Sequence, residues 1–242
     1  MAKFFRRIRQ KLLSKSKFSN YLLYALGEII LVVLGILLAL QINTWSTEKS
    51  NRAREQLYLR DYLTDLERNL SELDRVITKS NRTLSATDSL LRYAKGMLKI
   101  KDSSKIEYLV MESVNYTLFL SQEGTINDIF GSGDLALILN DSIRKSMVNW
   151  SSELKFLTEY EALGKDNQLQ CIDYLSTETP FYRMSFKGNF LDRATATRIL
   201  ADRRFLNLVS NQQHMATTLN GLYVGQKTKM QQLLAQVRSS IR

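Results

Sequence analysis

Two residues of this chain could carry metal or nucleophile chemistry by their type, and each is single. His214 is the only histidine and Cys171 the only cysteine among the 242 residues. Because zinc sites combine several histidine or cysteine ligands, one chain cannot assemble the usual zinc site. A histidine-based triad would have to use His214, and no Gly-x-Ser-x-Gly sequence presents a serine nucleophile. The sequence therefore predicts no catalytic residue, no metal site and no cofactor, and the protein is predicted not to be an enzyme.

The single cysteine also excludes an intrachain disulfide, so the fold must depend on packing. A free thiol can be reactive, can pair between chains, or can be a small buried hydrophobe. We expect Cys171 to be buried. We expect His214, which falls in a helical pattern, to be a solvated residue on the surface of a helix.

A third residue, Glu28, is the only acidic or basic side chain in the apolar stretch of residues 22–40. As a helix these residues span about 28 Å, close to the roughly 30 Å of a bilayer core. Gly35 and Ala39 are four residues apart, which permits close approach of another helix, and Glu28 falls on nearly the same face. The stretch predicts a membrane span with an interface at Glu28, Gly35 and Ala39. The alternative is a carboxylate that reaches hydrated headgroups.

The positive charge lies at one end of the chain. Residues 1–20 contribute +7 and no acid, which leaves only +4 for the chain beyond the apolar stretch, out of a net charge of +10. Such a distribution is typical of an orientation signal and argues against a nucleic-acid surface. It predicts a retained signal anchor with a cytoplasmic N-terminus and an exported body. The expected contacts with the bilayer interface are those of Arg6, Arg7, Arg9, Lys11 and Trp45.

A long helix is predicted after the span, because residues 46–95 contain no glycine or proline. Apolar residues recur there every seven residues, with companion positions between them, as in helices that pack along one seam. Residues 44–58 are polar and are predicted to form a solvated stalk. The predicted heptad seam consists of Leu63, Leu66, Leu70, Leu73, Ile77, Leu84, Leu91 and Leu98.

Three more helices are expected in the body. A break at Gly96 precedes a helix over about residues 106–120, and Thr125 is placed as the N-cap of the next segment. Asp141 or Ser142 is predicted to cap a long helix, and another helix begins at Asp202. The segment after Pro180 is predicted to be a loop or small hairpin, and its aromatic and basic residues are the predicted partner surface: Phe181, Tyr182, Arg183, Phe186 and Phe190.

The opening residues, FFRRIRQKLL and then KFSNYLLYALGEIILVVLGILLALQINTW, resemble the N-terminal signature of a family of single-span membrane proteins from Bacteroidota, known only as a domain of unknown function. The motif that carries the likeness is GEIxLVxxGILxALQIN. Weaker likeness continues at residues 132–144 and 202–209. The resemblance implies a bacterial inner-membrane anchor and a periplasmic helical domain, and it implies no activity, ligand or catalytic residue.

These observations predict an all-α protein with a single N-terminal transmembrane helix and an exported antiparallel bundle of long helices. The predicted parts are a leader (1–20), a span (21–43), a stalk (44–58) and the bundle (59–242). The predicted function is a membrane-anchored, non-enzymatic interaction or scaffolding module. Its expected partners are the lipid bilayer and a second copy or another membrane protein, with no nucleic acid.

Two other functions are compatible with the sequence. The first is a sensor or ligand-binding ectodomain that acts through a separate signalling partner, because about twenty residues of leader cannot hold an output domain. The second is a component of an ion-using membrane complex built on a ring of Glu28.

Overall fold

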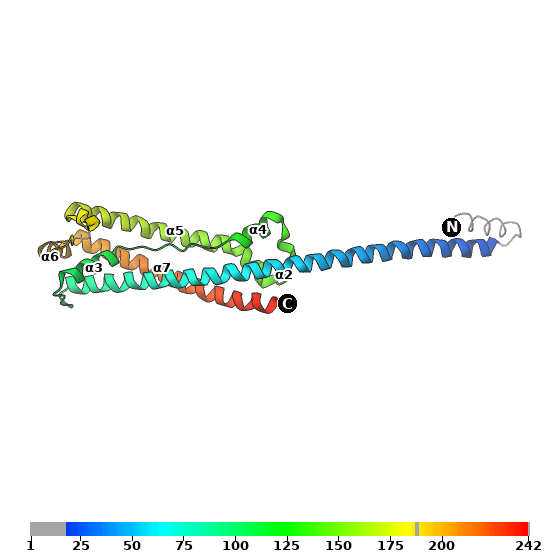
Figure 1. Ribbon diagram of the computed structural model, residues 1–242, viewed down its shortest axis with the longest axis horizontal. Helices are drawn as coiled ribbons and strands as arrows, with labels where there is room; N and C mark the ends of the chain where they lie inside the picture. The colour runs from blue at the N-terminus through cyan, green and yellow to red at the C-terminus, as the bar shows by residue number, and fades with distance from the viewer. Residues whose placement is uncertain (1–17, 187–188, 242) are drawn as a thin grey trace. The chain divides into compact units, whose positions relative to one another are not determined.

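The computed structural model describes residues 18–186 and 189–241, and all of the regular structure in them is helical, as the sequence predicts (Figure 1). Six α-helices and two short 3-10 helices are found in these residues. In chain order they are α2 (Phe18–Ala94), α3 (Ser103–Ser113), α4 (Gly124–Ser132), η1 (Asp134–Leu137), α5 (Asp141–Glu178), η2 (Phe181–Phe186), α6 (Arg193–Ala201) and α7 (Arg203–Ser240).

The chain divides into two compact units, Met1–Glu55 and Gln56–Arg242, and each is described by itself. The boundary falls inside helix α2 and inside the segment predicted to be a stalk. In the first unit every residue from 26 to 50 is exposed. By length and composition, the apolar N-terminal part of α2 is a candidate for crossing a membrane.

The second unit is built on three long helical segments, namely residues 56–94 of α2, α5 and α7, which lie alongside one another. Contacts at successive heights show that α7 runs antiparallel to both neighbours. Gln56 reaches the Ser240 carbonyl, and the Ser80 hydroxyl donates to the Ala216 carbonyl at 3.1 Å. On the α5 side, Gly164 lies against Leu219, and Glu153 accepts a hydrogen bond from Lys229.

The heptad residues of α2 pack within the chain, and the centre of the buried face differs from the predicted seam. Leu66 and Leu73 are fully buried, together with Leu59, Tyr62 and Val76, whereas Leu63, Leu70 and Ile77 are half-buried at the flank of the same core. Leu98 lies beyond the end of α2. The reason is that α2 faces two helices and an extended segment, so its buried face is wider than a two-stranded seam.

A second cluster of buried residues lies at the end of the unit where α3 and α6 are. Ile106 and Val110 of α3 meet Ile199 and Leu200 of α6 there. Phe190 is 1% exposed in this cluster, and the half-buried Phe181 packs edge-on against it with ring centroids 5.2 Å apart.

The predicted partner surface after Pro180 is therefore wrong at Phe190, whereas Phe181 is only half-buried. Phe190 belongs to the second buried cluster, and Phe181 packs against it from the outside. Tyr182 and Arg183 are exposed and stay predictions, and the side chain of Phe186 lies outside the described residues. The segment forms the 3-10 helix η2, where a loop or hairpin was expected.

The helix boundaries differ from prediction at three places. Helix α3 ends at Ser113, so the predicted helix over 106–120 is wrong after that residue. Thr125 lies inside α4 and is not its N-cap; its N–H and hydroxyl both donate to Asp65 of α2, at 3.0 and 2.7 Å. Helix α5 is capped by Asn140, one residue before the predicted Asp141. No sequence pattern predicted the short helix α6, which is capped by Asp192.

Candidate interaction site

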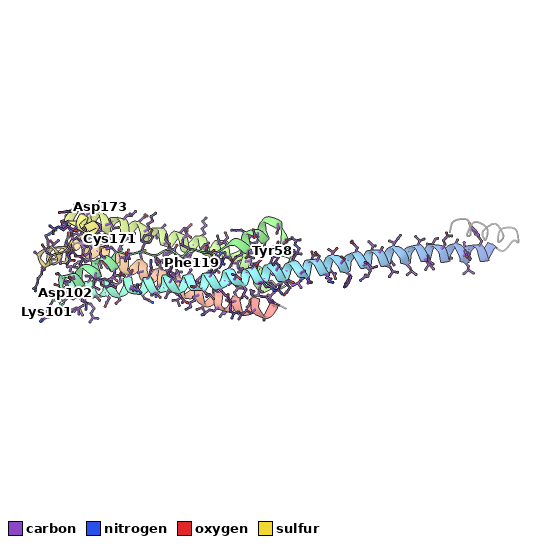
Figure 2. All side chains as sticks on the ribbon, viewed as in Figure 1. Tyr58, Lys101, Asp102, Phe119, Cys171 and Asp173 are labelled. Atoms are coloured by element: carbon purple, nitrogen blue, oxygen red, sulfur yellow. The ribbon has the colours of Figure 1, made fainter. Side chains whose placement is uncertain are left out.

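Residues 115–122, here called the strap, run as extended chain between α3 and α4 alongside the long helices. Side chains alternate along the strap as they do in a strand. Thr117 and Phe119 are buried, whereas Leu118 and Leu120 are exposed. Phe119 meets the Trp150 indole of α5 edge-on, with ring centroids 6.4 Å apart, and lies among the helices near the middle of the bundle (Figure 2).

Side chains of helix α2 bind the backbone of the strap. The Asn69 amide donates to the Gln122 carbonyl at 3.0 Å and accepts from the Gln122 N–H at 2.7 Å, as a neighbouring strand would. Arg75 donates to the Leu118 carbonyl at 2.9 Å, and Glu72 accepts from the Leu120 N–H at 3.3 Å. These contacts replace the hydrogen bonds that a helix would make internally, which explains why α3 can end early.

The other two helices hold the buried half of the strap. Glu161 of α5 is 3% exposed, and one oxygen of its carboxylate accepts from the Phe119 N–H at 2.8 Å and from the Tyr223 hydroxyl of α7 at 2.7 Å. The same Tyr223 hydroxyl lies 3.2 Å from the Thr117 carbonyl. Gln212 of α7 donates to the Asn115 carbonyl at 2.7 Å.

The pKa values of the two carboxylates that bind the strap are shifted in opposite directions. Burial raises the pKa of Glu161, and the hydrogen bonds from Tyr223 and Phe119 only partly offset that shift. The hydrogen bond from Arg75 holds the pKa of Glu72 below its usual range. Desolvation and the bond to Glu161 raise the pKa of Tyr223. The strap site is therefore built to hold backbone amides.

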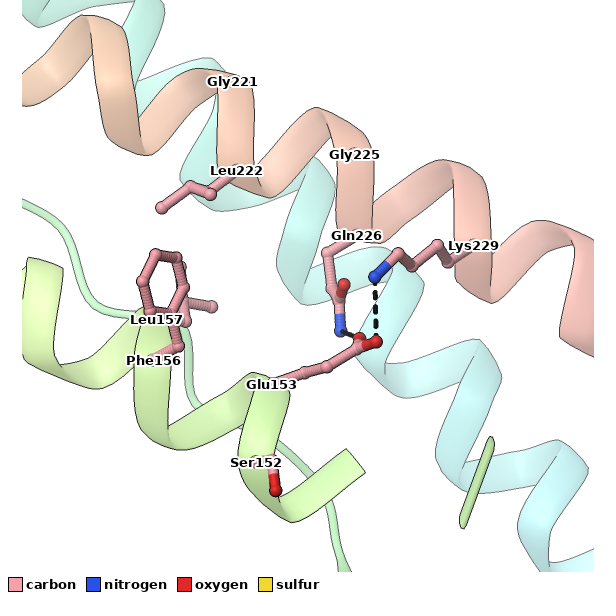
Figure 3. Close-up of a pocket in the computed structure, with 9 residues that line it drawn as sticks. All are labelled: Ser152, Glu153, Phe156, Leu157, Gly221, Leu222, Gly225, Gln226 and Lys229. Atoms are coloured by element: carbon pink, nitrogen blue, oxygen red, sulfur yellow. Dashed lines mark hydrogen bonds and ion pairs between the residues drawn. The ribbon is translucent and has the colours of Figure 1, made fainter. Parts of the chain in front are cut away.

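A second site lies between α5 and α7, where a hollow of about 440 Å³ is open to the surface (Figure 3). This α5–α7 groove is lined mainly by apolar atoms. In Figure 3, Leu222 points across it toward the Phe156 ring. The lining residues are Ser152, Glu153, Phe156, Leu157, Gly221, Leu222, Gly225, Gln226 and Lys229.

One end of the groove is closed by polar side chains. Glu153 of α5 accepts hydrogen bonds from Lys229 and Gln226 of α7, both at 2.8 Å. Burial opposes ionisation of Glu153, yet these two bonds and the nearby ammonium lower its pKa on balance. Because Glu153 and Lys229 neutralise each other, the groove carries no net charge.

Two glycines leave part of the α7 wall without side chains. A Cβ atom at Gly221 or Gly225 would meet no atom within 4 Å, so the two glycines leave open space on the groove side of α7. Opposite them, Phe156 is 50% exposed, and Leu163, one heptad later on α5, is 51% exposed. Tyr160 lies between them and its ring centroid is 5.1 Å from that of Phe156. The groove thus has an apolar rim on α5 and a recess on α7.

In the first unit, the predicted interface residues Glu28, Gly35 and Ala39 are all exposed on α2, and a Cβ atom at Gly35 would meet no atom within 4 Å. Trp45 is 62% exposed and the ammonium of Lys49 lies 5.6 Å from its ring centroid. The predicted anchors Arg6, Arg7, Arg9 and Lys11 lie outside the described residues.

The single cysteine and histidine are where their sequence context predicts. Cys171 is fully buried near the α3 and α6 end of the bundle, and burial raises the pKa of its thiol to about 12. His214 is exposed on α7. Within residues 18–186 and 189–241, no group of three or more histidine, cysteine, aspartate or glutamate side chains is placed to hold a metal ion.

Sequence reasoning missed both sites, although each leaves a signal. Asn69 is a polar residue in the apolar row of α2, and Glu161 is an acid in the apolar row of α5, so each marks a buried group that needs a partner. Gly221 and Gly225 have the same four-residue spacing as Gly35 and Ala39.

The fold and these sites define a class: an all-helical protein that joins one candidate membrane span to a bundle of three long helices. Within that class the chain belongs to the family of unknown function DUF6090, whose model matches residues 28–211. The match takes in most of α2, all of the strap and α5, and the first turns of α7. No curated protein and no solved structure is significantly similar to the chain.

Proposed function

We propose that this protein is a membrane-anchored, non-enzymatic interaction module of the bacterial envelope that associates with itself. In this proposal residues 21–43 cross the inner membrane of a Bacteroidota cell, the basic leader stays in the cytoplasm, and the bundle lies in the periplasm. The bundle would then be held at the membrane and would present its surface to other envelope proteins.

One observation carries the proposal. The apolar part of α2 is exposed at every residue from 26 onward, and its face contains Glu28, Gly35 and Ala39, with open space at Gly35. In lipid, where apolar surface alone does not drive association, small residues four apart favour close packing of helices. A carboxylate on the same face gains from a partner that supplies a hydrogen-bond donor.

The mass of the full chain tests self-association. In detergent and in nanodiscs, we expect the wild type to be larger than one chain. We expect Gly35→Ile to shift the protein toward monomer, because the added side chain keeps the helices apart. Gly27→Ile is the matched control, since residue 27 lies about 100° around the helix from Glu28. A wild type that is monomeric in both media contradicts the proposal.

Orientation has its own test. Protease added to spheroplasts should remove the bundle and leave the N-terminal leader protected, because the positive-inside rule keeps the basic end in the cytoplasm. An intact bundle in spheroplasts that is digested only after lysis would place the body on the other side of the membrane.

A second function has one observation in its favour. The α5–α7 groove, at about 440 Å³ and with an apolar lining, has the size of a small-ligand site, as a sensor ectodomain would need. Native mass spectrometry of the purified chain tests this function. A bound small molecule that is lost on filling the groove by Gly225→Leu would favour the sensor over the scaffold.

A further inference from the structure

The α5–α7 groove combines a protruding aromatic side chain with an apolar recess on the same surface. Phe156 stands half-exposed on α5, and the recess at Gly221 and Gly225 lies across the groove on α7. Protein surfaces normally cover a large aromatic ring with neighbouring side chains, because full burial of such a ring is worth about 1.5–3 kcal/mol. Here two of the facing residues are glycines, and Phe156 stays 50% exposed although Leu222 points toward its ring.

A surface that carries both a protrusion and its recess can pair with a copy of itself. In an isologous dimer the same patch is used twice, so each copy contributes one ring and one recess. Two glycines one turn apart allow a ring to approach the helix backbone, which larger residues on α7 would prevent. Tyr160 and Leu163 continue the apolar row on α5 for about two more turns and can extend the contact.

The charges of the groove also suit a second copy. Its only charged lining residues, Glu153 and Lys229, are of opposite sign and already bonded to each other. Two identical neutral faces do not repel, and a two-fold axis places residues of opposite sign near each other as readily as like charges. A strongly charged partner would find no complementary charge in this groove.

We propose that two copies of this chain associate through their α5–α7 grooves, with the second copy's Phe156 seated against Gly221 and Gly225. The inference rests on the proposed function and deepens it by naming the contact within the bundle. Chains anchored in one membrane share one orientation and a thin layer, so their effective concentration is high and a modest surface is sufficient.

The structure favours this occupant over a small apolar ligand. A small molecule would be contained by the hollow between Phe156 and the glycines, and it would leave Leu163 uncovered on the same face. A second copy covers the row of Phe156, Tyr160 and Leu163 together.

The test uses the full chain in detergent and follows the fraction of dimer against protein concentration. Gly225→Leu and Gly221→Leu fill the recess from within each copy, where the added Cβ meets nothing within 4 Å, so the bundle stays folded. We expect each to weaken dimerisation at least tenfold. Phe156→Ala removes the ring and should weaken it likewise. Ala235→Leu is the control, since it adds the same side chain at an exposed position of α7 that does not line the groove.

The outcomes separate this inference from the proposed function. Groove variants that dimerise like the wild type, while Gly35→Ile dissociates, overturn the groove contact and leave the proposed function standing. A wild type that is monomeric overturns both. Far-UV circular dichroism of each variant must match the wild type. Loss of a bound small molecule, without a change in the dimer fraction, would assign the groove to a ligand and also overturn the inference.

Discussion

The two sides of helix α5 show opposite solutions to the same packing problem. Three long helices leave grooves between them, and on one side the strap fills the groove between α2 and α5 with Phe119 and with backbone groups that side chains of the helices bind. On the other side, between α5 and α7, the chain supplies two glycines and leaves about 440 Å³ open. This fold fills one groove with its own chain and leaves the other open to the surface.

The chemistry of the two grooves differs as much as their filling. The strap groove presents carboxylate, amide and guanidinium groups placed to meet backbone N–H and C=O groups. The α5–α7 groove has only one ion pair, and that pair is satisfied within the chain. Unpaired buried polar groups are costly, so the first groove requires its strap, whereas the second can stay empty without a polar penalty.

The largest expected effect tests whether the strap is part of the core. Phe119→Ala should lower the free energy of unfolding by about 3–5 kcal/mol, because it removes a buried ring from contact with Trp150 and leaves a cavity. Chemical denaturation of the full chain in detergent, followed by circular dichroism, measures it.

Leu120→Ala, one residue along the strap, is the matched control. Its side chain is 65% exposed, so we expect a change within about 0.5 kcal/mol. Equal effects of the two substitutions would show that the strap is not packed between the helices, and the contrast between the two grooves would be lost.

A smaller effect is expected at Glu161, which joins the strap to α5 and α7. Glu161→Ala leaves the Phe119 N–H and the Tyr223 hydroxyl without this acceptor, at a cost of about 1–3 kcal/mol. Glu161→Gln keeps an oxygen at the same place, so both hydrogen bonds can persist. We therefore expect the glutamine variant to be much closer to the wild type than the alanine variant is.

The difference in stability between the wild type and Glu161→Gln is expected to depend on pH, with a definite sign. Because the pKa of Glu161 is raised in the folded protein, its stabilisation is complete below the pKa of the unfolded carboxyl and is lost as pH rises through the folded value. Relative to Glu161→Gln, the wild type should lose stability as pH rises. Glu72, whose pKa is lowered, acts in the opposite direction, and it cancels when the two proteins are compared at each pH. A difference that is constant with pH would contradict the raised pKa.

Much of the fold could be predicted from the sequence because its signals are long. The apolar stretch of residues 22–40, the heptads of α2 and the caps near Asp141 and Asp202 each involve many residues or a strong local rule. The all-helical class and the long helices followed from them. The predicted helix after Lys105 extends too far, because the observed helix ends at Ser113. The strap backbone is hydrogen-bonded by side chains of distant helices, such as Asn69 and Glu161, and no local sequence pattern contains these residues.

The α5–α7 groove shows a different limit. On α5, Leu157 is buried while its neighbour Phe156 is exposed. Whether a helix face is covered depends on the size of the facing residues. Glycines on α7 leave it open, and only the pairing of α5 with α7 reveals that they face Phe156.

The smallest expected effect is at the open α5–α7 groove, where the substitution is expected to stabilise the protein and not to destabilise it. Gly225→Ala should raise the free energy of unfolding of the monomer by up to about 1 kcal/mol, because alanine is the better helix former and its Cβ meets nothing within 4 Å. Gly133→Ala is the matched control: it has equal space, but its φ of +75° disfavours a side chain, so it should destabilise. Unfolding is measured at low protein concentration, where monomer predominates. If Gly225→Ala destabilises the monomer as well, the recess is filled within the chain, and the α5–α7 groove resembles the strap groove more than its open shape indicates.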